Sequence, residues 1–326
     1  MANIFSADVV DFSQYLKDTD TKQHIKKAGS YVQSLKDRLR TKVKQKVTRL
    51  PWSGTEKNFE FRRGEVSIWS GQNGHGKSLM TSQIALSIMG QGEKVCIASF
   101  EMKPVTTLQR MARNWIGINP FTPEFQGEEG IKSLDDLYDQ FGEWTDGKLW
   151  LYDQNDTVKN PDLIVGMARY CAKELGIDHI FIDNLAKVIS REDDYNGQKN
   201  FIDMLTSIAR DYGVHIHVVH HLKKPEKESS MPDKHDNKGT GAITDLADNI
   251  FLVWRNKLKE EDYRVSGQFG KMANDPDHLL MCRKQRNYEG SDEDEFTVKL
   301  WFNKDSQQYT GIPNSRSLEY WKQWPH

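Results

Sequence analysis

The sequence predicts an α/β fold in which helices flank a largely parallel, twisted β-sheet. Two observations carry this prediction. Short apolar runs of strand length alternate with longer helical patterns from residue 65 to residue 302, and such alternation is typical of a parallel sheet with helices on both faces. In addition, a glycine-rich stretch at residues 71–78 follows the first apolar run and opens a helical pattern, as expected where an α/β sheet holds a phosphate group.

The elements follow in order along the chain. Pro104 suits the first turn of a helix, and Gly176 and Gly213 each follow a helical pattern, where a left-handed glycine ends the helix. We expect strands at residues 65–69, 95–100, 149–152, 179–183, 214–219 and 250–254, and a final pair at 279–283 and 296–302. We expect helices at residues 79–89, 104–116, 134–141, 162–175 and 197–212.

The first 50 residues form a separate helical extension. Residues 1–20 have no assignable pattern, whereas a narrow apolar stripe at residues 24–47 predicts a helix. Basic residues surround this stripe, so the helix either docks on another surface, which we favour, or touches nucleic acid. The domains expected are an N-terminal extension at 1–50, a main domain at 51–305 and a C-terminal tail at 306–326. The stripe consists of Val32, Leu35, Leu39, Val43 and Val47.

The composition indicates a soluble globular protein. Hydrophobic residues make up 37% and charged residues 28% of the chain, and the formal net charge is −2, which excludes a global basic field. The cysteines Cys96, Cys171 and Cys282 have no disulfide or zinc spacing and indicate reduced core residues. The sequence has no apolar run of about 18 residues and no signal-peptide pattern, so we expect a cytoplasmic protein without membrane contact.

The glycine-rich stretch satisfies the pattern G-x-x-x-x-G-K-[ST] and predicts a P-loop. Backbone N–H groups of such a loop wrap the phosphates of a nucleotide, and the following helix N-terminus adds partial positive charge. Lys77 would reach the β- and γ-phosphates, and Ser78 would hold Mg²⁺. A chance turn is rejected because strand and helix are both in place. The nucleotide-binding residues expected are Gly71, Gln72, Asn73, Gly74, His75, Gly76, Lys77, Ser78 and Leu79.

Two carboxylates follow predicted strands. Asp183 ends an apolar strand, where it would face the P-loop and support Mg²⁺, although an Asp that merely opens a turn would look the same. Glu101 follows the strand after the P-loop helix and could polarise a water for attack on the γ-phosphate. It could equally favour the N-terminus of the helix at Pro104 through the helix dipole.

Three further polar groups follow later strands. His220 and His221 end one strand, where a side chain can sense the γ-phosphate, and a metal site with His215 and His217 is disfavoured by the spacing. Residues 223–241 combine five lysines and two glycines with four acids, so phosphate contact and a flexible surface loop remain equal alternatives. The segment 284–286 could supply an arginine finger or could be an ordinary strand end.

Taken together, these motifs resemble DnaB-type (superfamily 4) hexameric replicative DNA helicases. The resemblance rests on the P-loop and on five later segments in the family's order, and it covers about residues 50–305. The segment His-Leu-Lys-Lys-Pro at residues 221–225 resembles the corresponding motif of phage primase–helicases and the Twinkle helicase more than that of bacterial DnaB. The five segments are residues 99–102, Ile182-Asp183, residues 220–223, residues 238–242 and residues 284–287.

The resemblance implies a RecA-like motor domain with assigned residues. Glu101 is then the catalytic base, His221 the γ-phosphate sensor, and Asp183 with Ser78 the Mg²⁺ support. Lys284 and Arg286 act on the neighbouring subunit's nucleotide, and the N-terminal helix becomes a linker that packs on the next subunit. The positions that sandwich the base are Arg255 and Phe302, and those that grip single-stranded DNA are Lys238, Gly239, Thr240 and Gly241.

These assignments lead to an ATP-dependent (or other NTP-dependent) ring helicase that moves 5′ to 3′ on single-stranded DNA with Mg²⁺. No zinc-binding primase module precedes the motor, and Gly239 replaces a glutamate of bacterial DnaB. We therefore expect a stand-alone phage or prophage helicase that relies on a separate primase and on a loader or polymerase. The alternatives are a RecA-like recombinase or filament-forming ATPase, and a P-loop regulator or loader that does not unwind DNA.

Overall fold

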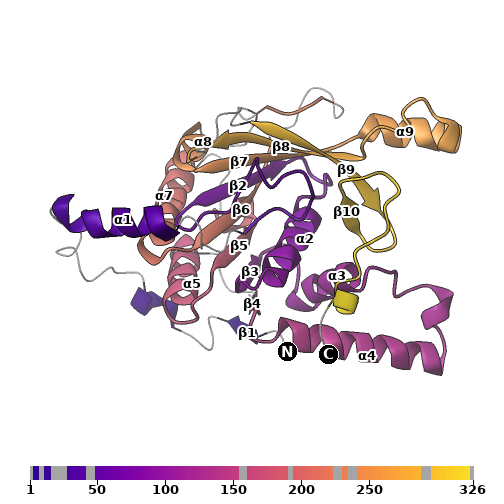
Figure 1. Ribbon diagram of the computed structural model, residues 1–326, viewed down its shortest axis with the longest axis horizontal. Coiled ribbons are helices and arrows are strands. Elements are labelled where there is room, and N and C mark those ends of the chain that lie inside the picture. Colours follow the sequence, from indigo (N-terminus) through magenta and orange to yellow (C-terminus); the bar gives the residue numbers. More distant parts are fainter. Residues whose placement is uncertain are drawn as a thin grey trace.

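A computed structural model describes residues 3–6, 11–15, 28–41, 48–153, 160–189, 194–222, 230–233, 236, 241–287 and 295–323. Within these residues ten strands form one sheet in the order β1-β4-β3-β5-β6-β2-β7-β8-β9-β10 (Figure 1). The strands from β1 to β7 in this order are parallel, and β8, β9 and β10 add antiparallel neighbours, which confirms the largely parallel sheet. The strands are β1 Asn3–Ser6, β2 Val66–Gly71, β3 Val95–Ser99, β4 Leu149–Asp153, β5 His179–Asp183, β6 His215–His221, β7 Asn249–Arg255, β8 His278–Gln285, β9 Phe296–Asn303 and β10 Gln308–Thr310.

Helices cover both faces of the sheet, as the alternation predicted (Figure 1). Local signals set several helix ends: Asn160 caps α5 by accepting from the Asp162 N–H, Asp194 caps α7, and Gly213 ends α7 with a left-handed φ of 65°. The α-helices of the described residues are α1 Val32–Thr41, α2 Lys77–Gly90, α3 Pro104–Ile116, α4 Glu128–Thr145, α5 Pro161–Lys173, α6 Leu185–Val188, α7 Tyr195–Tyr212, α8 Gly241–Leu246 and α9 Lys257–Ser266.

The alternation of side chains along the strands divides the core into two layers. Val66 and Ile68 of β2 face one layer, which α5 and α7 complete, whereas Trp69 faces the other layer, which α2, α3 and α4 complete. The two layers lie on opposite faces of the sheet, and between them the central strands β2 and β5 are buried along their whole length. The central strands are therefore held rigidly by packing, and their carboxyl ends provide a fixed edge for a site.

The structure adds elements that the sequence did not predict. Residues 3–6, which had no assignment, form β1 and pair in parallel with β4. The helix expected at 134–141 extends to Glu128–Thr145, because polar residues precede and follow its short apolar core. The short α8 and the exposed α9, which projects from the sheet in Figure 1, were not predicted either, because their sequences have no periodic pattern of apolar residues.

The packed unit continues beyond residue 305, the boundary expected from the sequence. β10 pairs with β9, and Tyr309 is buried with its backbone N–H and C=O bonded to the Gln83 side chain of α2 at 2.7 and 2.8 Å. The indole of Trp321 donates to Ile116 O at the end of α3 (3.1 Å). A three-residue strand held by side-chain hydrogen bonds has no sequence period, so no local pattern predicted these contacts.

The helical extension is described only in part. Residues 28–41 are helical, as predicted, while the rest of the expected helix lies outside the described residues. Val32 and Leu35 of the apolar stripe are 47% and 58% exposed on this single chain. Among the described residues, no helix combines the length and apolar character that a membrane span requires.

A buried cluster of three histidines lies between β5 and β6. The Nδ1 of His179 is 3.1 Å from Nε2 of His217, and His215 bonds the Arg62 carbonyl (2.6 Å) and the Ser67 hydroxyl (2.8 Å). Burial is the main cause that lowers the pKa of all three, and it lowers the pKa of His215 to about 4. These rings serve as neutral core residues, and within the described residues no group of three potential ligands is placed to hold a metal.

The lowered pKa values of the buried histidines predict that the free energy of unfolding falls in acid. Because the folded-state pKa of His215 lies below the unfolded value of about 6.5, its contribution to stability is present above that value and is lost as the pH falls. Between pH 7 and pH 5 this loss is about 2 kcal/mol in the free energy of unfolding. Asp183, whose pKa is raised to about 6, acts in the opposite direction. Between pH 7 and pH 5, the free energy of unfolding of His215→Asn should therefore fall by about 2 kcal/mol less than that of the parent, as measured by urea unfolding at both pH values. An equal fall in both proteins would contradict the assignment.

Candidate nucleotide and catalytic site

The P-loop connects β2 to α2 as predicted, and its glycines take conformations that other residues adopt poorly. β2 ends at Gly71 and α2 begins at Lys77, while Gly74 and Gly76 have φ of +76° and +84°. A Cβ atom at Gly71 would lie 2.7 Å from Val253 O, so β7 packs directly against this backbone. The loop therefore depends on glycine for both its turn and its close packing.

Lys77 lies buried against the backbone of the loop. Its Nζ donates to Gly71 O (2.8 Å) and Gln72 O (3.0 Å). Burial lowers the pKa of Lys77 to about 8, and the carboxylates of Asp183 and Glu101 partly oppose that shift. The ammonium group is thus held close to the carboxyl ends of the central strands, where it faces two acids.

Asp183 and Ser78 meet at the end of β5. Asp183 is buried, and desolvation raises its pKa to about 6, while a hydrogen bond from Ser78 acts in the opposite direction. The Oδ1 atom of Asp183 is buried and has no hydrogen-bond partner within the described residues. A buried carboxylate oxygen beside a hydroxyl is a donor set that suits a hard divalent cation such as Mg²⁺.

Glu101 and His221 lie on either side of a side chain that the sequence did not single out. Nδ2 of Asn184 donates to Oε1 of Glu101 and lies 2.9 Å from Nε2 of His221, whose Nδ1 lies 3.1 Å from Nζ of Lys77. β3, β5, β6 and β2 are adjacent in the sheet, so their carboxyl ends bring these groups together. The structure places five predicted residues in one polar network: Lys77, Ser78, Glu101, Asp183 and His221.

The two residues expected to sandwich a base, Arg255 and Phe302, come from strands β7 and β9. Arg255, at the end of β7, donates from Nη1 to Gly74 O (3.0 Å) and pairs with Glu260. Phe302 of β9 contacts the rings of His278 and Tyr309, with centroid distances of 6.0 and 5.2 Å. Arg255 thus touches the P-loop directly, whereas Phe302 belongs to an aromatic cluster beside it.

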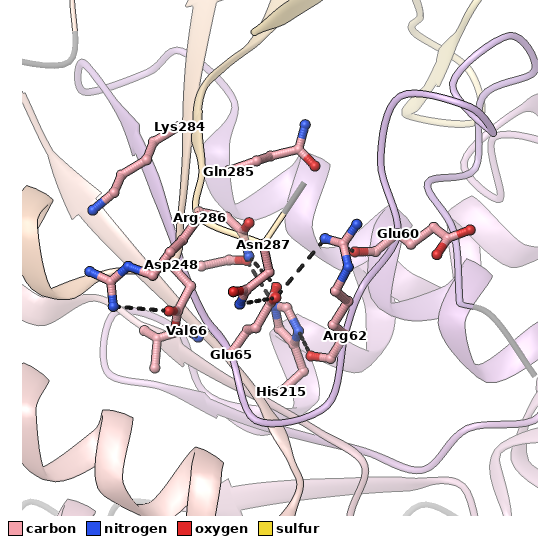
Figure 2. Close-up of polar contacts among 12 residues, drawn as sticks. Glu60, Arg62, Glu65, Val66, His215, Asp248, Lys284, Gln285, Arg286 and Asn287 are labelled. Carbon is pink, nitrogen blue, oxygen red and sulfur yellow. Dashed lines mark hydrogen bonds and ion pairs between the residues drawn. The ribbon is translucent and has the colours of Figure 1, made fainter. Parts of the chain in front are cut away.

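Lys284 and Arg286 lie at the end of β8 that pairs with the start of β7, opposite the carboxyl ends that hold the P-loop. Figure 2 shows both residues beside Asp248. Lys284 Nζ donates to Thr244 O, Asp245 O and Ala247 O at the end of α8, at 2.6, 3.0 and 2.7 Å. Arg286 pairs with the buried Asp248 (3.3 Å), whose backbone N–H bonds Val66 O at the start of β2. Since a strand rises about 3.3 Å per residue, the five steps from Val66 to Gly71 separate these cations from the P-loop by about 16 Å.

The residues expected to contact DNA either directly precede α8 or begin it. Lys238, Gly239 and Thr240 lie outside the described residues, and Gly241 is the first residue of α8. The end of α8 meets Lys284 and Arg286, so one short helix joins the end of the expected DNA loop to the two cations.

Residues 57–311 match the DnaB-like helicase C terminal domain family, well over half of the chain. The protein belongs to the DnaB-like helicase family. This membership confirms the resemblance inferred from the P-loop and the later motifs.

Relatives of this DnaB-like chain include phage and bacterial proteins. It is 29% identical over 245 residues to the DNA helicase/primase of Enterobacteria phage T3, covering 69% of this chain and 42% of that protein. It is 24% identical over 223 residues to the replicative DNA helicase DnaB of Treponema pallidum, covering 66% and 49%. The chain thus spans less than half the length of these two relatives.

Solved structures support the RecA-like fold. A DnaB-like replicative helicase, solved in a study of its interactions with primase, superimposes with a TM-score of 0.68 at 15% identity, covering 90% of this chain and 68% of that chain. A second structure, an isolated ATPase domain, gives the same TM-score at 17% identity over 88% of this chain and all of its own.

Three residues that lie beside the P-loop or in the polar network were not identified from the sequence: Asn184, His278 and Tyr309. Asn184 directly follows the predicted metal carboxylate, and that position was the one available signal. Tyr309 lies in the segment treated as a tail, although its hydroxyl reaches Gly76 O (3.4 Å) beneath the P-loop. His278 has a Nδ1 atom that is buried without a hydrogen-bond partner in the described part of the chain, and burial is the main cause that lowers its pKa to about 3.

The packing of Tyr309 under the P-loop is testable with two glycine substitutions. Gly74→Ala and Gly76→Ala both place alanine at a positive φ, which costs about 1 kcal/mol. A Cβ at Gly76 would also clash with the Tyr309 hydroxyl, whereas a Cβ at Gly74 would meet no atom within 4 Å. Gly76→Ala should therefore lower the free energy of unfolding more than Gly74→Ala, and Tyr309→Phe should restore part of the difference in urea unfolding. Equal losses in the two single variants would contradict this packing.

Proposed function

We propose that this chain is the nucleotide-hydrolysing motor of a replicative DNA helicase that assembles as a ring and moves on single-stranded DNA. The observation that carries the proposal is the polar network at the carboxyl ends of four adjacent strands, in a chain of the DnaB-like family. The named activities of the phage and bacterial relatives support it.

The network divides the chemistry of ATP hydrolysis among its members. Lys77 now donates to the carbonyls of Gly71 and Gln72 in the P-loop. With nucleotide bound, its ammonium group would exchange these contacts for the β- and γ-phosphates. Glu101 would accept the proton of the attacking water, and His221, which contacts Lys77, would respond to the γ-phosphate. Ser78 and Asp183 would hold Mg²⁺, which neutralises charge on the phosphate oxygens.

A neighbouring subunit would complete the site. Arg286 and Lys284 lie about 16 Å along the strands from their own P-loop, so we infer that they serve the nucleotide of the next subunit. The exposed Val32 and Leu35 of α1 fit a linker helix that packs on a neighbour.

 The ring proposed is a hexamer, as the family resemblance implies.

DNA and protein partners follow from the same proposal. Lys238, Gly239, Thr240 and Gly241 would contact the backbone of single-stranded DNA, and translocation would run 5′ to 3′. Arg255 and Phe302 would enclose the base of ATP or another NTP, with Arg255 fixed by its bond to the P-loop. We propose that a separate primase, loader or polymerase acts with this ring in the bacterial cytoplasm, in a phage or prophage context that the phage relative supports.

Fork unwinding tests this function directly. The parent protein should separate a forked duplex only when ATP and Mg²⁺ are supplied. Lys77→Ala should abolish hydrolysis and unwinding, because the lost contacts are with phosphate. Glu101→Gln should still bind nucleotide but turn over roughly 10²-fold more slowly, while Glu129→Gln on the exposed start of α4 should behave like the parent. Strand exchange on filaments would indicate a recombinase instead, and nucleotide-dependent DNA binding without unwinding would indicate a loader.

Mixed rings test the action of Arg286 across the subunit boundary. Arg286→Ala should bind nucleotide normally and hydrolyse it about 10³-fold more slowly or worse, the effect of losing an arginine finger. Mixing it with Lys77→Ala should restore part of the hydrolysis, because intact P-loops then face intact fingers. Arg264→Ala on the exposed face of α9 is the matched control and should hydrolyse normally.

Native mass measurements must first show that the two variants share rings. Mixed rings that recover no hydrolysis would contradict a finger that serves one neighbouring site independently of the others. A fully active monomer would contradict the ring itself.

A further inference from the structure

The side chain of Asn184 occupies the centre of the catalytic network. The residue is fully buried at the end of β5, directly after Asp183. Its Nδ2 donates to Oε1 of Glu101 and lies 2.9 Å from Nε2 of His221. One amide nitrogen therefore contacts both the expected base and the expected γ-phosphate sensor. Nε2 of His221 and Oε1 of Glu101 are themselves 3.7 Å apart.

The orientation of this amide is fixed by the backbone. Oδ1 of Asn184 accepts from the Lys187 N–H (3.1 Å) and thereby caps the first turn of α6. Exchanging the oxygen and nitrogen would break this cap and would turn an oxygen towards the carboxylate of Glu101. The amide consequently keeps its two N–H groups directed at Glu101 and His221.

His221 meets a hydrogen-bond donor at each ring nitrogen. Asn184 Nδ2 lies beside Nε2, and Lys77 Nζ lies 3.1 Å from Nδ1. A neutral imidazole has only one acceptor nitrogen, so these two contacts compete. When a phosphate takes the Lys77 ammonium, the competition ends. Nε2 can then accept from Asn184, and the proton on Nδ1 faces the position of Lys77 and of the phosphate.

We propose that Asn184 is a positioning residue that couples Glu101 to His221. It holds the carboxylate of Glu101 in place and, through the same nitrogen, selects the His221 tautomer that presents N–H to the γ-phosphate. A change at the sensor is thereby transmitted to the base through a single buried amide. This inference rests on the proposed hydrolysis at this site, and it adds a residue whose side chain need not touch the nucleotide.

The test uses a substitution that keeps the cap and removes the donors. Serine caps helices about as well as asparagine, but its hydroxyl is too short to reach both Glu101 and His221. Asn184→Ser should reduce kcat about 10-fold or more, since small displacements of catalytic groups are costly. The Kd for a nonhydrolysable ATP analogue and the KM should stay within about threefold, and the urea midpoint should stay close to the parent's. Asn160→Ser, the same change at the exposed cap of α5, should leave all four quantities unchanged.

A double-mutant cycle shows whether Asn184 acts through Glu101. In a Glu101→Ala background there is no carboxylate to position, so adding Asn184→Ser should lower the residual rate less than about threefold. Asn184→Asp, which also keeps the cap acceptor but replaces the donors with an acceptor, provides a second variant and should lower kcat at least as much as the serine variant.

The outcomes separate this inference from the proposed function. A parent protein that does not hydrolyse ATP would overturn the proposed function. A parent that hydrolyses ATP and loses rate in Glu101→Gln, but keeps its rate in Asn184→Ser and Asn184→Asp, would overturn the coupling alone. Weaker analogue binding with an unchanged kcat, or a full additional loss in the Glu101→Ala background, would also overturn it.

Discussion

The burial of the Lys77 ammonium at the carboxyl edge of the sheet is the constraint on which the site depends. A buried cation needs compensation, and here two P-loop carbonyls and the carboxylates of Asp183 and Glu101 provide it. Each of these groups must stand at the end of its own strand, and the strands must be neighbours. The parallel order β3-β5-β6-β2 satisfies this requirement because the two packed layers of helices fix the strands from both faces.

The sheet also separates two groups of cations. Its carboxyl edge carries Lys77 and Arg255 beside the P-loop, whereas Lys284 and Arg286 are held at the amino edge by the end of α8 and by Asp248. Asp248 is itself tied to the start of β2 through Val66. A chain built in this way has two different faces, one with the P-loop and one with the two cations. The proposed ring would bring these faces together head to tail, a contact that closes into a ring where its rotation allows.

Much of the core and part of the site could be predicted from local pattern. The apolar runs at β2, β3 and β5 and the helical periods of α3 and α7 are strong because each is buried on both faces or along a full stripe. The P-loop and Asp183 were predictable because strand, turn chemistry and helix lie within a few residues of one another. β1, α9 and β10 were not predictable, because β1 and β10 are short edge strands and α9 buries no side chain.

The sequence by itself determined that this chain has a nucleotide-binding loop, a largely parallel sheet and the family's polar residues in order, because each of these is written in a short continuous stretch. Only the tertiary structure decided which of those residues meet. It placed Glu101, Asn184 and His221 in one hydrogen-bonded group, put Arg286 at the other edge, and folded Tyr309 under Gly76. These contacts join residues separated by 37 to 233 positions. Only the order of the strands brings them together, and no local pattern encodes that order.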